Sequence, residues 1–215
     1  MTDAYLPALS ELKFTAQEAD AIKAALSLPK PWGVDNEHIK NVKNKIREHH
    51  LERHGQTCCY CRIILQGSGH FMIDREHILP KGNAKYKILC YEPWNLSSSC
   101  KRCNMEIKGE DDNFVIDKTD ASKLKLSSNY LFVHPNFDEW EKHLTREAHQ
   151  ISRFVFVKYA IIDNSTKGQY TYEYFKLKDL EIESLNAAQG IKNPAPDPSE
   201  GAIEARAIAE AFGQL

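Results

Sequence analysis

The chain has 215 residues, of which 42% are hydrophobic and 27% charged, with a formal net charge of −2. This is the composition of an ordinary globular protein, and no window approaches the roughly 20 apolar residues of a membrane span, so no membrane partner is expected. Residues 1–14 alternate apolar and polar side chains without a basic start, so we expect no secretory signal and a cytoplasmic location.

The small net charge hides an asymmetry along the chain. Residues 36–110 carry 13 Lys and Arg against 8 Asp and Glu, a net of +5, whereas the remainder carries 15 against 22, a net of −7. Six of the nine histidines lie in the basic stretch, and we expect His49 and His50 among them to be in solvent. A basic module fits contact with a polyanion such as nucleic acid, although an unevenly charged surface is the simpler alternative.

Two helices are expected before the first cysteine. Thr15 is a suitable N-cap for a helix over 15–28, and Glu18 three residues later completes a capping box. A second helix is expected over 36–54, where apolar residues recur at helical spacing and Gly55 follows.

The middle of the chain reads as strand, loop, strand and helix. Residues 71–78 and 94–99 have extended patterns, and 101–108 reads as a short helix ended by Gly109. Further on, we expect a helix over 139–151 and a hairpin formed by 154–162 and 170–175. A proline-rich linker at 191–199 and an amphipathic helix at 200–212 would follow.

Six cysteines in a reducing compartment favour metal binding over disulfides. Four of them form two Cys-x-x-Cys pairs separated by 38 residues, Cys58 with Cys61 and Cys100 with Cys103. Four thiolates are the tetrahedral set of a structural zinc, which leaves no coordination position for chemistry. Cys59 and Cys90 fall outside the spacing and are expected to be small buried hydrophobes.

A different group of side chains has the chemistry for phosphodiester cleavage. His77 has the pKa range of a general base, and Glu76 and Asn104 offer hard oxygen ligands that suit Mg²⁺ or Mn²⁺. Adjacent residues on a regular strand point to opposite faces. Glu76 and His77 can therefore share a site only if the strand ends, bends or bulges there.

These motifs occur in an order that resembles the HNH endonuclease family over about 55 residues. The resemblance is carried by the two cysteine pairs, Asp74 to Lys81, Trp94-Asn95-Leu96, Asn104 and Lys108-Gly109. It implies an α+β protein with a ββα-metal nuclease core over 54–112, framed by a helical segment over 1–53. An α/β extension would occupy 113–189, and the linker and final helix 190–215.

The resemblance also implies roles for individual residues. His77 would be the general base, Asn95 would orient the loop that carries it, and Glu76 and Asn104 would bind the catalytic ion, while the four cysteines bind zinc. Glu76 stands where the family more often has Asp, and Asn104 where it often has His. The products would carry 5′-phosphate and 3′-hydroxyl ends.

The sequence around His77 resembles that of bacterial HNH proteins of anti-phage systems, including the nuclease component of Septu-type and retron-linked systems. It implies nucleic acid as substrate, with DNA expected, and a partner ATPase or sensor. Five cations near the motifs are candidates for phosphate contact, with surface solubility as the alternative: Arg75, Lys81, Lys101, Arg102 and Lys108.

Other functions share parts of these motifs. A zinc deaminase would need a residue between His and Glu and an open zinc position, and the sequence offers neither. A non-catalytic zinc module that binds nucleic acid or protein stays open as the alternative. A second metal site could be formed by His134 and His143, but structural roles for both are favoured. A base-stacking platform could be formed by alternating tyrosines at 170, 172 and 174, but packing roles are favoured for them as well.

Overall fold

The computed structural model describes residues 3–69, 71–151 and 154–182 of the chain. It is α+β, as predicted, and it divides into two compact units, Met1–Trp140 and Glu141–Leu215. No helix within the described ranges combines the length and apolar character needed to cross a bilayer. The linker and helix predicted at 191–199 and 200–212 lie outside the described residues.

The first predicted helix is confirmed as α1 (Ala16–Leu26). Its capping box forms as expected: the hydroxyl of Thr15 accepts from the N–H of Glu18 at 3.2 Å, and the carboxylate of Glu18 accepts from the N–H of Thr15 at 2.8 Å. Two N–H groups at the helix start are thereby satisfied.

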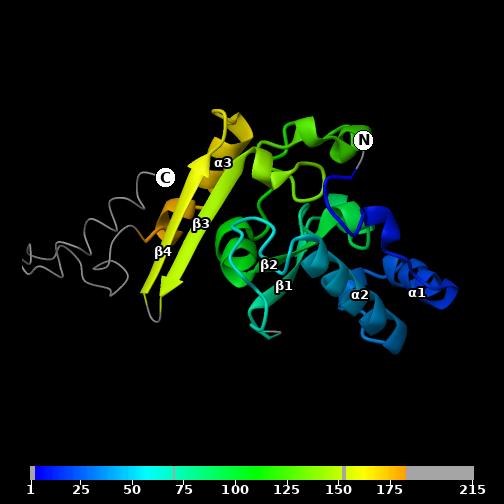
Figure 1. The fold of residues 1–215 in the computed structure, drawn as a ribbon. Helices are drawn as coiled ribbons and strands as arrows, with labels where there is room; N and C mark the ends of the chain where they lie inside the picture. The colour runs from blue at the N-terminus through cyan, green and yellow to red at the C-terminus, as the bar shows by residue number, and fades with distance from the viewer. Residues whose placement is uncertain (1–2, 70, 152–153, 183–215) are drawn as a thin grey trace, which may run out of the picture. The chain divides into compact units, whose positions relative to one another are not determined.

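The second predicted helix is confirmed as α2 (Glu37–Arg53), which lies beside α1 in Figure 1. The side chain of Asn36 caps it by accepting from Ile39 N at 2.9 Å. Its inner face is fully buried in a core with α1 and β2, through Ile39, Val42 and Ile46. The prediction that His50 is in solvent is wrong, because its side chain is buried on the same helix.

The predicted strand, loop, strand and helix are present in the first unit. Strand β1 (Ile73–His77) pairs antiparallel with β2 (Leu96–Cys100), so that Ile73 lies opposite Cys100 and His77 opposite Leu96. The helical segment η5 (Arg102–Lys108) follows at once and is a π-helix. The N–H of Gly109 closes it on the carbonyl of Asn104 at 2.7 Å, and Gly109 has a φ of 49°, a backbone conformation that favours glycine.

A second set of buried side chains lies in the first unit and is mostly aromatic. Its fully buried members include Tyr60, Phe114, Tyr130 and Phe132. The ring of Phe114 lies 4.3 Å from that of Phe132, and the ring of Tyr60 lies 5.7 Å from Phe132. Tyr60 therefore joins this core to the segment that carries the first cysteine pair.

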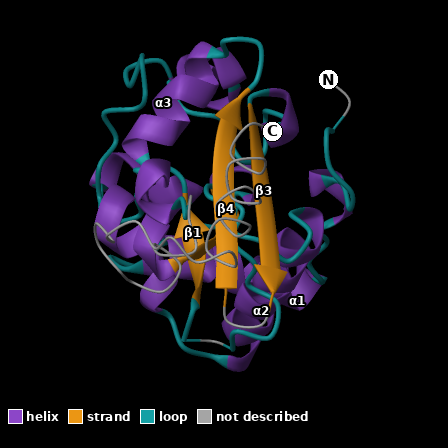
Figure 2. Cartoon of the chain, turned by 60° about the vertical axis from the view of Figure 1, so that its left-hand side comes forward, coloured by secondary structure: helices purple, strands orange, loops and turns teal. Residues whose placement is uncertain are grey.

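The second unit differs from the prediction in two places. Strand β3 (Leu144–Ile151) occupies most of the predicted helix 139–151 and pairs antiparallel with β4 (Phe154–Ile161), as Figure 2 shows. Residues 170–175, predicted as the second strand of a hairpin, fall mainly in helix α3 (Thr166–Tyr174). The predicted hairpin is present, but β4 pairs with the strand before it, β3, and not with a strand after it.

Both corrections have a physical cause. Residues 144–151 contain good helix formers, but pairing with the aromatic and β-branched β4 outweighs that weak local preference. At the start of α3 the hydroxyl of Ser165 accepts from Gly168 N at 3.0 Å, so a helix begins between the two segments that were predicted as strands. Tyr170 and Tyr174 then stack one helical turn apart, with ring centroids 5.7 Å apart, so the tyrosines do not alternate on a strand.

Candidate metal centre and catalytic pocket

The four paired cysteines come together as predicted. Their sulfur atoms lie within 4.8 Å of one another, and all four residues are buried. The Sγ atoms of Cys61 and Cys100 are 3.8 Å apart. A tetrahedral zinc with Zn–S bonds of about 2.3 Å requires S···S separations of about 3.8 Å, so the cluster fits a structural zinc.

Backbone hydrogen bonds shape the metal centre. The N–H of Cys58 donates to Ile63 O at 2.9 Å, and the N–H of Arg62 donates to Cys58 O at 3.0 Å, which closes the first cysteine turn. The N–H of Cys103 points at Cys100 Sγ at 3.5 Å. Cys59 and Cys90 are buried outside the cluster, as predicted.

His77 is the last residue of β1, and its side chain is held in a defined orientation. Its Nε2 lies 3.1 Å from Cys90 O, and its ring meets the ring of Trp32 edge-on at 4.4 Å. Because a carbonyl oxygen only accepts, Nε2 must carry the proton of this hydrogen bond, and Nδ1 keeps its lone pair. Nδ1 has no hydrogen-bond partner among the described residues.

Burial, aided by the nearby charge of Lys81, lowers the pKa of His77 to about 3. Burial also lowers the pKa of His50 to about 3, with the charges of His49 and Arg53 as smaller causes. Both imidazoles are therefore neutral in the folded protein at pH 7. For His77 this leaves Nδ1 able to accept a proton.

These shifts predict that the protein loses stability in mild acid. The unfolded chain binds a proton at each histidine below pH 6.5, while the folded chain does not until about pH 3, so the stabilisation present above pH 6.5 is lost as pH falls. Each histidine should cost about 2 kcal/mol at pH 5. Urea unfolding of zinc-loaded protein at pH 7 and 5 measures this, and His50→Gln should reduce the loss by about 2 kcal/mol. An equal loss in wild type and variant would contradict the assignment.

Asn95 fixes the segment that follows His77. Its side-chain oxygen accepts from Leu79 N at 2.7 Å, and its Nδ2 donates to Leu79 O at 3.3 Å and Leu89 O at 3.2 Å. Its own carbonyl accepts from Ile78 N at 2.9 Å. One fully buried side chain therefore holds the backbone directly after His77.

Glu76 is also fully buried, but it is occupied by other groups. Its Oε1 accepts from the ammonium of Lys108 at 3.0 Å and from the hydroxyl of Tyr60 at 3.1 Å. Burial is the largest influence on this carboxyl and raises its pKa against the opposing effect of Lys108. Its Oε2 has no hydrogen-bond partner among the described residues.

Breaking the buried pair by Lys108→Met should lower the free energy of unfolding by about 3 to 5 kcal/mol, because Glu76 would stay in the interior without a counter-charge. Replacing both partners, Glu76→Gln with Lys108→Met, should recover most of that loss. Urea unfolding in saturating zinc measures both. Additive losses in the double variant would show that the pair is not coupled.

The acid that contacts Asn104 is Asp74. The amide Nδ2 of Asn104 donates to Asp74 Oδ2 at 3.1 Å, and Lys101 Nζ lies 2.8 Å from Asp74 Oδ1. Asp74 and Glu76 are two residues apart on β1 and so share a face of the strand. No role was predicted for Asp74, although its spacing from Glu76 was the available signal.

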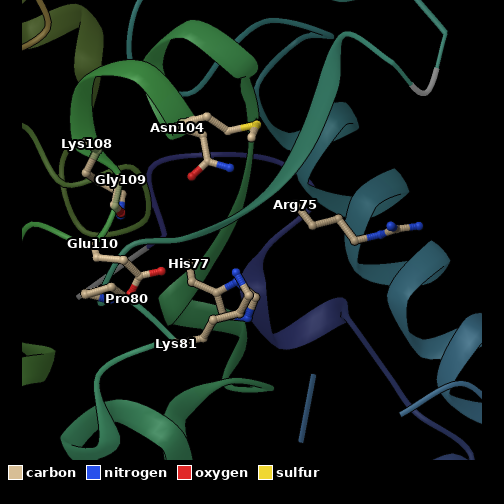
Figure 3. A pocket seen from close by; sticks show the side chains of 9 residues that line it. Arg75, His77, Pro80, Lys81, Asn104, Lys108, Gly109 and Glu110 are labelled. Carbon is tan, nitrogen blue, oxygen red and sulfur yellow. The ribbon is translucent and has the colours of Figure 1, made fainter. Parts of the chain in front are cut away.

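A pocket opens beside these groups (Figure 3). It is lined by Arg75, His77, Pro80, Lys81, Asn104, Met105, Lys108, Gly109 and Glu110. His77 and Asn104 thus come from different elements to one pocket, whereas Glu76, which was predicted to bind the catalytic ion with Asn104, is not among the lining residues. Glu110 was not predicted; a Cβ built on Gly82 would lie 2.7 Å from its carboxyl carbon, so glycine lets this acid approach.

The five predicted phosphate contacts differ in what they can reach. Lys81 is exposed and lines the pocket. Lys108 is 2% exposed and paired with Glu76. Arg75 points away from the other labelled side chains in Figure 3, toward α2, where it donates to Lys43 O at 2.8 Å.

The remaining two cations do not line the pocket: Lys101 forms a salt bridge with Asp74, and Arg102 is half-buried.

The two histidines considered as a second metal pair have other contacts. The buried ring of His134 stacks on the ring of Phe137, with centroids 4.0 Å apart, and Nδ1 of His143 is hydrogen-bonded to the Ser165 hydroxyl at 2.6 Å. Within the described ranges, the four cysteines are the group of His, Cys, Asp and Glu side chains close enough to hold a metal.

No family model, curated protein or solved structure matches this chain.

Proposed function

We propose that this protein is a metal-dependent endonuclease that hydrolyses phosphodiester bonds of nucleic acid, with DNA as the expected substrate. The supporting observation is His77: a neutral imidazole whose buried Nδ1 has no hydrogen-bond partner among the described residues, at a pocket that Asn104 and Lys81 also line. The resemblance to HNH endonucleases of anti-phage systems points to a role in phage defence, in the cytoplasm, with a partner ATPase or sensor.

In this proposal, His77 accepts a proton from the attacking water at Nδ1 while Cys90 O holds the ring through Nε2. Asn95 keeps the segment after His77 in place, so the ring does not turn away. The exposed ammonium of Lys81 attracts the phosphate to the pocket and screens its charge.

The divalent ion that the proposal requires would be bound between β1 and η5. Glu76 and Asn104 would hold it, because hard oxygen donors suit Mg²⁺ or Mn²⁺. Glu76 Oε2 is a buried oxygen without a hydrogen bond among the described residues, and Asn104 lines the pocket. When bound, such an ion stabilises the charge that builds on the phosphate.

The test is cleavage by the purified, zinc-loaded protein. Plasmid DNA and structured RNA are incubated with Mg²⁺ or Mn²⁺, with and without EDTA, beside His77→Gln. We expect cleavage that requires the added ion and His77, and DNA should be cut faster than RNA. Cleavage that persists in EDTA, or that is as fast in the variant as in the wild type, would count against the proposal.

A non-catalytic zinc module that binds nucleic acid is the second candidate. The burial of Glu76 against Lys108 favours it, because a carboxylate already paired with an ammonium has less need of a cation. This module would shift nucleic acid in a gel at low salt and leave it intact with Mg²⁺ and Mn²⁺. The two candidates therefore differ in one measurement, the appearance of new ends.

A further inference from the structure

Asp74 lies between two side chains, and each of them is hydrogen-bonded to a different oxygen of its carboxylate. One carboxylate oxygen receives the Lys101 ammonium at 2.8 Å, and the other receives the Asn104 amide nitrogen at 3.1 Å. Its side chain is 17% exposed, so both hydrogen bonds are partly screened from water. Asp74 is therefore held from one side while it holds Asn104 from the other.

The chemistry of this contact fixes which way the Asn104 amide faces. A carboxylate only accepts hydrogen bonds, so the edge of the amide that meets Asp74 must be Nδ2. The amide oxygen then lies on the other side of the amide from the nitrogen that meets Asp74, and Figure 3 shows the oxygen and nitrogen of the labelled Asn104 side chain pointing to different sides. That oxygen makes no hydrogen bond to the described residues, and Asn104 lines the pocket that His77 also lines.

We propose that Asp74 is a positioning residue that orients the Asn104 amide so that its oxygen, not its nitrogen, is presented to a divalent cation in the pocket. This inference rests on the proposed function and goes beyond it, because it assigns to Asp74 a role that acts through another residue. A ligand oxygen fixed in advance need not be reoriented when the ion binds.

The direct test is the affinity for Mn²⁺, measured by electron paramagnetic resonance on zinc-loaded protein in the presence of a non-cleavable DNA analogue. Asp74→Ala should weaken Mn²⁺ binding by about 10- to 100-fold, the usual cost of losing a partner that orients a metal ligand. Zinc content should not change. Unaltered Mn²⁺ affinity in this variant would overturn the inference.

A double-mutant cycle separates orientation from charge. In Asp74→Asn, Lys101 should take the new amide oxygen, so the amide nitrogen faces Asn104 and Asn104 turns its oxygen away from the pocket. Mn²⁺ binding should then fall about tenfold or more. Adding Lys101→Met removes the competitor and should restore binding to within about threefold of wild type, because the amide of residue 74 can again accept from Asn104.

Lys101→Met alone is the matched control, since Asp74 still accepts from Asn104 without it; it should change Mn²⁺ affinity less than about threefold. If instead the two single changes shift affinity in opposite directions and add in the double variant, only local charge matters and the inference fails. A wild-type protein that binds no Mn²⁺ would overturn the proposed function, and this inference with it.

Discussion

Replacement of His77 by glutamine is expected to lower the rate of DNA cleavage by about 10²- to 10⁴-fold, the contribution typical of a general base. Glutamine fills much of the space beside Trp32 but cannot accept a proton from water near neutral pH. Single-turnover cleavage with Mn²⁺ in excess measures the rate constant of the chemical step. The nuclease proposal also requires that the variant bind DNA with wild-type affinity.

His38 supplies the matched control, because it is an exposed histidine on α2. His38→Gln should cleave at the wild-type rate. Zinc content and the midpoint of urea unfolding should be compared in all three proteins, since His77 is buried and its replacement also alters packing. Full activity in a folded His77→Gln protein would remove His77 from the mechanism.

The features predicted best from the sequence are those that local chemistry decides. Thr15 with Glu18 marks a helix start whatever else the chain does, because the hydrogen bonds span three residues. The spacing of Cys58 and Cys61 likewise gives the metal cluster, since a two-residue gap lets two sulfurs point to one ion. The capping box does not depend on the rest of the fold, and each cysteine pair depends only on its own turn, although the fold must bring the two pairs together.

The features predicted poorly depend on distant partners. Residues 144–151 form a strand only because β4 pairs with them, and no local pattern of theirs alternates clearly. His50 was expected in solvent because its neighbours are basic, yet α2 is covered on that face. Tertiary burial outweighed local composition in both cases.

The candidate site shows the same division. The motif order indicates which residues gather near one pocket, and His77 and Asn104 both line it. It does not indicate which acid meets which amide, because that depends on the register between β1 and η5. In the structure Asp74 is opposite Asn104 and Glu76 opposite Lys108, two contacts that follow from a strand step of two and a helix step of four.

The four-cysteine cluster carries the other prediction: Cys100→Ser should abolish zinc binding and unfold much of the first unit. Cys100 ends β2 immediately before η5, so its bond to zinc would tie the hairpin and the helical segment to the turn that holds Cys58. Apparent binding free energies of structural zinc sites are about 10 to 16 kcal/mol at pH 7, comparable with the whole stability of a domain.

Zinc per chain from elemental analysis, together with urea unfolding, measures the effect. The wild type should hold one zinc per chain, and a strong chelator should reproduce the Cys100→Ser phenotype. Cys90→Ala is the matched control, because Cys90 is also buried but lies outside the cluster; this variant should keep its zinc and lose only the packing of one sulfur. If Cys100→Ser retained full zinc and an unchanged unfolding midpoint, the four sulfurs would not be a structural metal site, and the hairpin would have to be held by packing alone.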